Sequence, residues 1–367
     1  MGWKAGACEE VLFHQRGTLA HIVLNRPKAL NALTLGMART VHSHLATAVN
    51  DSSIVSVMVS GMGGKAFCAG GDVKGVWAAA KGGGGPSVGA GGEPLPDAFF
   101  REEYALNLAL ATSRKPQVSV WDGLVMGGGA GLSVHGRFRV ATQSALFAMP
   151  ETKIGFFPDV GATSFLSALP GALGEFLGLT GERLRAADLL YTGLATHHVP
   201  SSLLPELQGA LESSRSTDGV EQALAKFHTA VEEVAPLQGV REAIDRCFGC
   251  ESVEAIEAAL EREGSDWADG VLGVLRSSSA VSRKVTLRLL REARGKPLAD
   301  CLRAEFRAAQ AFMVPPSDFF EGIRAQLVDK DRQPKWSPST PLEVDEEMLH
   351  KYFAPLASRE LSCDENI

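Results

Sequence analysis

Apolar residues recur along the first half of the chain with two different spacings. Short apolar or β-branched runs predict strands at residues 11–14, 19–24 and 54–60. Between residues 30 and 49, leucine, methionine and valine recur every three or four positions, which predicts an amphipathic helix. The alternation continues through a helix at 99–111, a strand at 117–121, a glycine-opened helix at 127–135, and strands at 138–141 and 145–148. This order predicts an α/β fold for residues 1–200.

After Pro200 the strand-like runs stop, and residues 201–367 are predicted to form a helical region whose tail is extended after Pro334. The expected helices are 203–211, 219–234, 240–248, 253–262, 267–277, 281–293 and 298–313. A glycine-rich insertion at 81–96 interrupts the first half and is predicted to be a flexible surface loop. It lacks the strand before it and the helix directly after it that a phosphate-binding glycine loop needs.

Composition and charge narrow the classes of function. The 367 residues are enough for two domains. No uninterrupted apolar run reaches the 18 or so residues that a membrane span needs. A net charge of −7 argues against a general nucleic-acid surface, so a phosphate-bearing ligand would need local basic groups. Residues 1–10 lack the apolar or arginine-rich pattern of a signal or transit peptide, and 365–367 are not a peroxisomal signal.

Six cysteines are scattered through the chain, which is typical of reduced thiols rather than of a disulfide framework. Cys247 and Cys250 form a lone CxxC pair, without the second pair or the histidines that would complete a zinc site. We therefore expect no metal site.

Two glycine-rich segments follow predicted strands. The segment 61–72, GMGGKAFCAGGD, has small residues at 69–71 that let a ligand approach the backbone closely. The segment 125–133, VMGGGAGLS, places glycine N–H groups at a helix N-terminus, where they can stabilise a developing oxyanion. A plain tight turn and close helix–sheet packing also call for glycine. Two such segments in one α/β unit favour a paired oxyanion hole over either alternative.

Ser133 lies in a segment that fails the G-x-S-x-G pattern at its last position, because His135 stands where glycine is required. A serine nucleophile is therefore disfavoured, and His135 is expected to end the helix before Gly136.

Glu151 and Asp159 are two carboxylates eight residues apart among apolar and rigid neighbours. Burial raises the pKa of a carboxyl group, and two nearby carboxylates push their pKa values apart. One can then act as nucleophile or base and the other as its hydrogen-bonding partner. Both residues could instead be helix N-caps, an alternative that is stronger for Asp159 because a helix is predicted directly after it.

Several of these motifs resemble the enoyl-CoA hydratase/isomerase (crotonase) superfamily. They are KAFCAGGD at 65–72, MGGG at 126–129 and PET at 150–152. Longer matches resemble its 3-hydroxyisobutyryl-CoA hydrolase branch, at residues 99–104, 131–136, 155–161, 195–197 and 329–336. The resemblance runs over nearly the whole chain.

The resemblance implies a spiral of ββα units with a C-terminal helical region. It implies that the N–H groups of Gly71 and Gly128 form the oxyanion hole, with Glu151 and Asp159 as catalytic carboxylates. Glu103 would line the acyl pocket, within a charged cluster that sequence alone suggests is solvated. The CoA part of the substrate would be bound by Arg26, Lys28, Lys65 and Ala69. The resemblance implies no separate cofactor, and it implies that the protein resides in the mitochondrion. It leaves open whether the protein forms a homo-oligomer.

One departure separates activities within the superfamily. Hydratases of similar pattern carry a second glutamate in the helix after the glycines, where this chain has Gly131. Loss of that glutamate together with the presence of Asp159 favours hydrolysis of a short hydroxyacyl thioester, by attack of Glu151 or of water that it activates. The alternatives are hydration or isomerisation of an enoyl-CoA, and a non-catalytic part of the mitochondrial small ribosomal subunit.

Overall fold

The computed structural model describes residues 9–82 and 92–363. A six-stranded sheet has the order β1-β2-β3-β5-β7-β9, in which β1 and β2 are antiparallel and the other neighbours are parallel. Its strands are β1 (Val11–Arg16), β2 (Leu19–Leu24), β3 (Ser56–Gly61), β5 (Gln117–Trp121), β7 (Phe138–Ala141) and β9 (His197–His198). A second, parallel sheet has three short strands, β4 (Ala66–Cys68), β6 (Leu124–Met126) and β8 (Leu146–Ala148).

The chain builds these two sheets together, one turn at a time. Each turn runs from a strand of the large sheet to a strand of the small sheet and then into a helix. The pairs β3–β4, β5–β6 and β7–β8 lead to α2 (Val73–Lys81), α4 (Gly128–Gly131) and a short 3₁₀ helix (Glu151–Ile154). Because the three small strands are parallel, the segments that leave them all start at one edge of the small sheet.

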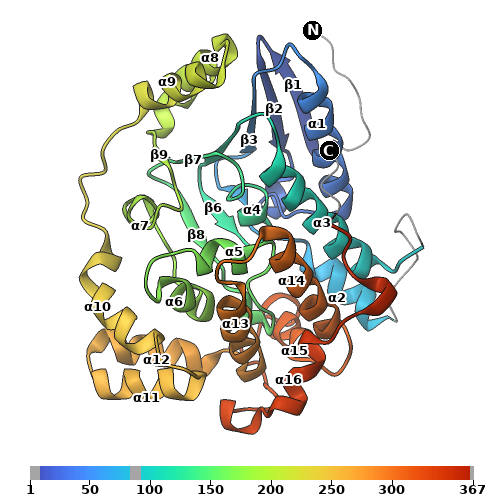
Figure 1. The fold of residues 1–367 in the computed structure, drawn as a ribbon, viewed down its shortest axis with the longest axis vertical. Coiled ribbons are helices and arrows are strands. Elements are labelled where there is room, and N and C mark those ends of the chain that lie inside the picture. The colour runs from blue at the N-terminus through green and yellow to red at the C-terminus, as the bar shows by residue number, and fades with distance from the viewer. Residues whose placement is uncertain (1–8, 83–91, 364–367) are drawn as a thin grey trace.

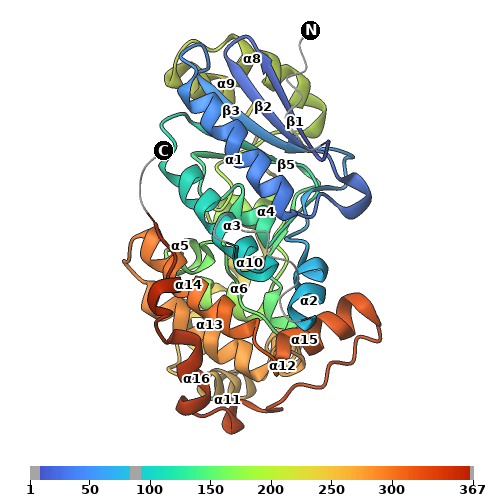
Figure 2. The same ribbon diagram turned by 90° about the vertical axis from the view of Figure 1, so that its right-hand side faces the viewer.

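Helices cover both faces of the large sheet. Val57 and Val59 pack toward α1 (Leu35–Asn50) and α3 (Leu95–Thr112), whereas Met58 packs toward α8 (Leu204–Ser213) and α9 (Thr217–Phe227). This alternation follows the two-residue period of a strand. The views in Figure 1 and Figure 2 show the two helix layers on opposite sides of the sheet.

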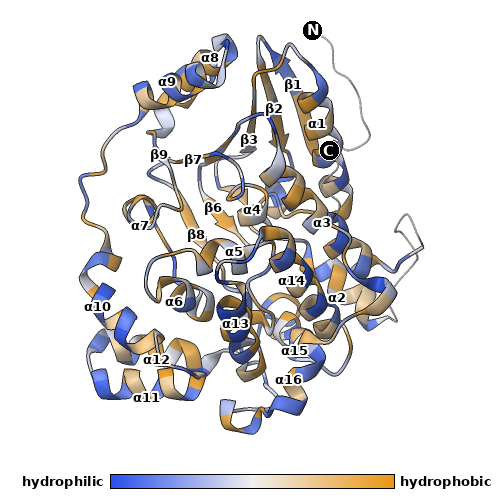
Figure 3. Ribbon diagram, viewed as in Figure 1, coloured by the Kyte–Doolittle hydropathy of each residue, from blue (hydrophilic) through white to orange (hydrophobic). Residues whose placement is uncertain are grey.

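The remaining helices are α5 (Ala162–Ser167), α6 (Leu173–Thr180), α7 (Ala186–Tyr191), α10 (Pro236–Phe248), α11 (Val253–Glu263), α12 (Asp266–Ser277), α13 (Ala280–Ala293), α14 (Leu298–Phe312), α15 (Asp318–Ile323) and α16 (Glu346–Phe353). Most of them lie toward the end of the molecule away from α8 and α9, whereas α5 and α7 lie nearer its middle (Figure 1). Helix α13 packs against α5 and α6, and α14 packs against α3 and α5. Figure 3 shows that these helices carry apolar residues on some faces and polar residues on others. The described residues contain no helix that is long and apolar enough to cross a membrane.

Several predicted boundaries are wrong for local reasons. The first helix begins at Leu35 rather than at residue 30, because Leu30 and Asn31 have positive φ and Thr34 caps the helix by accepting the Met37 N–H at 3.1 Å. The glycine-opened helix ends at Gly131, and the helix predicted at 219–234 ends at Phe227. The tail after Pro334 is not extended throughout, since α16 buries Leu349 and Tyr352.

The insertion is shorter than the predicted range 81–96. Helix α2 continues to Lys81 and α3 begins at Leu95. Residues 83–91 lie outside the described residues, as do 1–8 and 364–367.

Candidate active site

A cavity of about 400 Å³ opens at the edge where the small strands end. The segments after β4, β6 and β8 contribute Ala69–Gly71, Met126–Gly128 and Glu151 to its wall. Helix α3 adds Phe99, Phe100 and Glu103 from the opposite side, and the loop before α5 adds Asp159 and Val160. The π-helical turn Arg324–Val328 adds Gln326 and Leu327. The cavity therefore joins residues from distant parts of the chain.

The two glycine segments meet at this cavity. A methyl group built on Gly128 would lie 3.2 Å from the backbone nitrogen of Gly71 and 2.6 Å from Oε1 of Glu103. Gly128 is the first residue of α4, and N–H groups in the first turn of a helix have no partner within the helix. The two glycine segments therefore lie together in space, as predicted, and the carboxyl group of Glu103 faces them.

Glu151 opens the 3₁₀ helix after β8 and is 7% exposed. Its Oε2 atom has no hydrogen-bond partner among the described residues, and a methyl group on Gly127 would lie 2.9 Å from its Oε1. Burial raises the pKa of Glu151 well above its ordinary value, and the charge of Asp159 adds to this. The N-cap of the 3₁₀ helix is Pro150, so capping does not explain the position of the Glu151 side chain.

Asp159 is 6% exposed, and Oδ2 of its carboxylate accepts a hydrogen bond from the Tyr104 hydroxyl at 2.7 Å. Burial raises the pKa of Asp159 to about 7, although the Tyr104 hydrogen bond opposes the rise. Helix α5 begins at Ala162 with Gly161 as its N-cap, so the Asp159 side chain is not a cap either. Sequence reasoning missed Tyr104, because its partner lies 55 residues away.

Glu103 is 2% exposed, and its Oε1 atom has no partner among the described residues. Burial and then the charge of Asp159 raise the pKa of Glu103 well above its ordinary value. The interpretation of residues 100–104 as a solvated cluster is wrong, since Phe100, Glu103 and Tyr104 are all buried. With Glu103, Glu151 and Asp159 in one cavity, ionisation of one carboxyl group disfavours ionisation of the others.

Of the four residues predicted to bind CoA, one lies in the wall of the cavity. Ala69 lines the cavity, but Arg26, Lys28 and Lys65 do not. Arg26 forms ion pairs with Glu10 at 3.2 Å and Asp72 at 3.0 Å, whereas both lysines are exposed. The segments that carry Lys28 and Lys65 lie against one another, as the position of Gly63 shows. A methyl group on Gly63 would lie 2.7 Å from Cβ of Pro27.

Two cations that sequence reasoning missed do line the cavity, namely Lys153 and Arg183. Burial lowers the pKa of Lys153, and the nearby Arg183 lowers it further, while Glu182 opposes the change. Lys153 follows Glu151 by two residues in the sequence. This short separation was the one signal that could have indicated Lys153 as a residue of the cavity.

Ser133 and His135 form hydrogen bonds with separate backbone carbonyl groups rather than with one another. The Ser133 hydroxyl donates to the Gly129 carbonyl at 2.7 Å, and His135 Nε2 lies 2.7 Å from the Val160 carbonyl oxygen. A Ser–His nucleophile is therefore not assembled. His135 lies beyond the C-terminal end of α4, so the prediction that it ends this helix is wrong.

The position at which hydratases carry a second glutamate is closed here. A methyl group on Gly131 would lie 2.6 Å from Cβ of Val160 and 2.8 Å from Nδ2 of Asn107. A longer side chain could enter only if α3 or the loop after Asp159 moved. Among the described residues no cluster of histidine, cysteine and acidic side chains could hold a metal ion.

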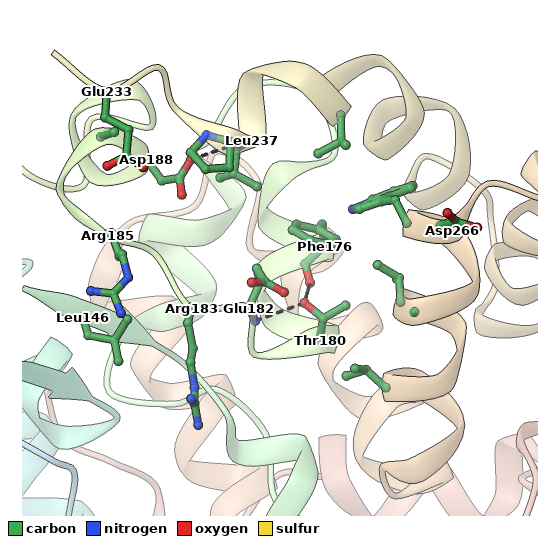
Figure 4. Close-up of a pocket in the computed structure, with 17 residues that line it drawn as sticks. Leu146, Phe176, Thr180, Glu182, Arg183, Arg185, Asp188, Glu233, Leu237 and Asp266 are labelled. Atoms are coloured by element: carbon green, nitrogen blue, oxygen red, sulfur yellow. Dashed lines mark hydrogen bonds between the residues drawn. The ribbon is translucent and has the colours of Figure 1, made fainter. Parts of the chain in front are cut away.

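A larger cavity of about 610 Å³ lies beside the first, and Arg183 lines both (Figure 4). Its walls come largely from α6, α7, α10 and α12 and from the segments that precede α7 and α10. They carry the acidic residues Glu182, Asp188, Glu233 and Asp266. Asp188 accepts a hydrogen bond from the Leu237 N–H at 2.9 Å, as Figure 4 shows. The glycine segments and the buried carboxyl groups Glu151 and Asp159 are not part of this wall.

Comparison with known proteins adds independent information. Residues 19–353 match a family described as Enoyl-CoA hydratase/isomerase. Proteins named "3-hydroxyisobutyryl-CoA hydrolase, mitochondrial" from Homo sapiens and Danio rerio are 44% and 45% identical, over 98% of this chain and 92% and 93% of their own lengths.

Solved structures share this fold, although the proteins in them are named for other activities. A carnitinyl-CoA dehydratase from Mycobacterium thermoresistibile is 39% identical with a TM-score of 0.88, covering 97% of this chain and 99% of its own. An enoyl-CoA hydratase from Rhodobacter sphaeroides is 34% identical with a TM-score of 0.87, covering 96% and 100%.

Proposed function

Because the chain belongs to the enoyl-CoA hydratase/isomerase family, we propose that it hydrolyses 3-hydroxyisobutyryl-CoA to 3-hydroxyisobutyrate and CoA. The family resemblance and the spiral ββα fold expected from the motifs are both confirmed. The protein is an acyl-CoA thioester hydrolase, as its full-length relatives are named, and it belongs in the mitochondrion with them. The reaction is a step of valine breakdown.

One observation supports this reaction most strongly. Two buried carboxyl groups, Glu151 and Asp159, face a cavity at which the backbones of Gly71 and Gly128 come together. In our scheme the N–H groups of the two glycines donate hydrogen bonds to the thioester carbonyl oxygen. They stabilise the negative charge that grows on this oxygen when the carbonyl carbon is attacked.

Glu151 either attacks the carbonyl carbon with its own oxygen or takes a proton from a water molecule, whose oxygen then attacks. In the direct route an anhydride forms between Glu151 and the acyl group, the C–S bond breaks and CoA leaves as a thiolate. Water then cleaves the anhydride and restores the carboxylate. In the other route the water oxygen adds to the carbonyl carbon, the same C–S bond breaks, and the proton held by Glu151 passes to the CoA sulfur. Asp159, held by Tyr104, orients the attacking water or the substrate hydroxyl.

The rest of the substrate is placed by the cavity wall. Glu103 faces Gly128 and is suited to bind a substrate hydroxyl in the acyl pocket. Ala69 would bind CoA through its backbone, with Arg26, Lys28 and Lys65 nearby for the phosphates. No further cofactor enters the scheme, and assembly into a homo-oligomer stays a prediction.

Hydration of an enoyl-CoA is the alternative that the names of the two structurally similar proteins raise. The closed position at Gly131 disfavours it, because a second glutamate cannot be placed there without a shift of Val160 or Asn107. A purely structural role, as in a ribosomal subunit, gives no reason for buried carboxyl groups without partners.

The test of this function is thiol release from 3-hydroxyisobutyryl-CoA, followed with a thiol-reactive dye. We expect release of one CoA per acyl group, and slower release from isobutyryl-CoA because it lacks the hydroxyl. Methacrylyl-CoA and crotonyl-CoA should show no loss of enoyl absorbance. Hydration of either enoyl substrate, with no thiol release from the hydroxyacyl thioester, would assign the chain to the hydratase activity instead.

The raised pKa of Glu151 predicts how the rate depends on pH. A base or nucleophile works only when ionised, so activity is lost as pH falls through its pKa. An ordinary glutamate stays ionised down to a pH of about 4.5. We therefore expect kcat/KM to fall well before the pH is lowered to 4.5, because the pKa of Glu151 is raised. The rate is measured with a disulfide dye that reacts in acid. A flat profile down to pH 5 would contradict the assigned role.

A further inference from the structure

Glu305, on α14, is a buried carboxyl group that the scheme above does not use. Its Oε2 atom accepts a hydrogen bond from the Gly161 N–H at 2.7 Å. Its Oε1 atom accepts from the Thr163 N–H at 2.9 Å and from the Thr163 hydroxyl at 2.6 Å. The side chain is fully buried. All three hydrogen bonds go to a segment of the first half of the chain that lies more than 140 positions away.

This segment directly follows Asp159 and has an unusual backbone. Val160 has φ 57° and Gly161 has φ 82°. A β-branched residue rarely adopts positive φ, and such strain persists only where the surroundings fix it. Glu305 fixes one side of the segment. His135 fixes the other side, since its Nε2 lies 2.7 Å from the Val160 carbonyl oxygen, which can only accept.

The direction of the Asp159 side chain depends on this backbone. Its carboxylate reaches the cavity and meets the Tyr104 hydroxyl, while the next residue, Val160, turns its own side chain against Gly131. If Val160 relaxed to negative φ, the chain before Gly161 would rotate and Asp159 would leave its place. The three hydrogen bonds to Glu305 oppose that relaxation from the Gly161 side.

We propose that Glu305 is a positioning residue for the thioesterase reaction, and that it acts by holding residues 160–163 so that Asp159 stays aimed into the cavity. This proposal rests on the role proposed above for Asp159. It gives α14, in the C-terminal helical region, a direct part in the geometry of the active site. Burial raises the pKa of Glu305 to about 8, although the hydrogen bonds from Thr163 and Gly161 oppose the rise.

The test is a double-mutant cycle with Glu305→Gln and Asp159→Asn, read by thiol release from 3-hydroxyisobutyryl-CoA. Glutamine keeps the size of the side chain but turns an NH₂ group toward one of the N–H donors. We expect Glu305→Gln alone to lower kcat about tenfold or more, with KM changed less than about threefold. In the Asp159→Asn background the same change should lower kcat less than about twofold, because the group that Glu305 positions is already gone.

Gln310→Met is the matched control, because Gln310 lies on the same helix, is also buried, and accepts from Arg359 at 2.9 Å. It should leave kcat unchanged. Should Glu305→Gln fail to fold, Thr163→Val replaces it in the cycle, since it removes only the hydroxyl that donates to Oε1.

Each other outcome has a separate meaning. Equal losses of kcat from Glu305→Gln in both backgrounds would show a general structural role and overturn the proposal, as would wild-type kcat in the single variant. If Asp159→Asn itself keeps the wild-type rate, the proposed function of Asp159 fails, whatever Glu305→Gln does.

Discussion

Replacement of Glu151 by glutamine is expected to lower kcat for thiol release about a thousandfold. Glutamine has the same shape but supplies neither a nucleophilic oxygen of useful strength nor a base. Substrate binding should change little, because the glycine N–H groups and the cavity wall remain. The measurement is kcat and KM for 3-hydroxyisobutyryl-CoA. A single-turnover experiment also follows the substrate that is bound to the variant.

Stability provides a check that this loss is chemical. Burial favours the neutral form of Glu151 in the folded protein. At pH values above the pKa that Glu151 has in the unfolded chain, this carboxyl group therefore destabilises the fold. Glutamine is always neutral. The variant should therefore unfold at the same temperature as the wild type or higher at pH 8. A fully active Glu151→Gln protein would remove Glu151 from the mechanism, and a variant of lower melting temperature would contradict the assigned burial cost.

Gly128→Ala is the second change with a large expected effect. The added methyl group would lie 2.6 Å from Glu103 Oε1 and 3.2 Å from the Gly71 nitrogen, in the space between the two proposed oxyanion donors. Alanine keeps the N–H group but would displace the thioester carbonyl oxygen from it. Loss of one such hydrogen bond lowers kcat by a factor on the order of a hundred to a thousand. We expect a loss of this size in kcat/KM for 3-hydroxyisobutyryl-CoA.

Gly209→Ala is the matched control for this substitution. Gly209 lies within α8, and a methyl group there would have nothing within 4 Å. It should keep full activity and raise stability by up to about 1 kcal/mol, because alanine favours a helix interior over glycine. Wild-type activity in Gly128→Ala would mean that the thioester carbonyl does not bind between Gly71 and Gly128.

The parts of the fold that could be predicted are those with enough residues to show a period. Strands β5 and β7 and most helices of the second half fall close to their predicted places. Strands β4 and β6 were not predicted, because each has only three residues and lies beside a glycine motif that carries no alternation. Yet these two strands deliver both glycine segments to the cavity, so the motif sequences were more informative there than the periodicity.

For the site, the sequence could predict residues that sit on local motifs. Glu151, Asp159 and the glycine segments are examples, and the structure brings them together. Tyr104 and Glu305 could not be predicted from local pattern, because each acts on the Asp159 loop from far along the chain. The ion pairs of Arg26 with Glu10 and Asp72 likewise depend on the fold.

In our scheme Glu151 and Asp159 together hydrolyse the thioester in this cavity. The most direct measurement is kcat/KM for thiol release from 3-hydroxyisobutyryl-CoA by the wild type, Glu151→Gln and Asp159→Asn. Glu233→Gln, in the neighbouring larger cavity, serves as control. We predict release by the wild type and the control, and losses of about a hundredfold or more in both carboxylate variants. Release that is unaffected by either substitution, or absent from a folded wild-type protein, would contradict the claim.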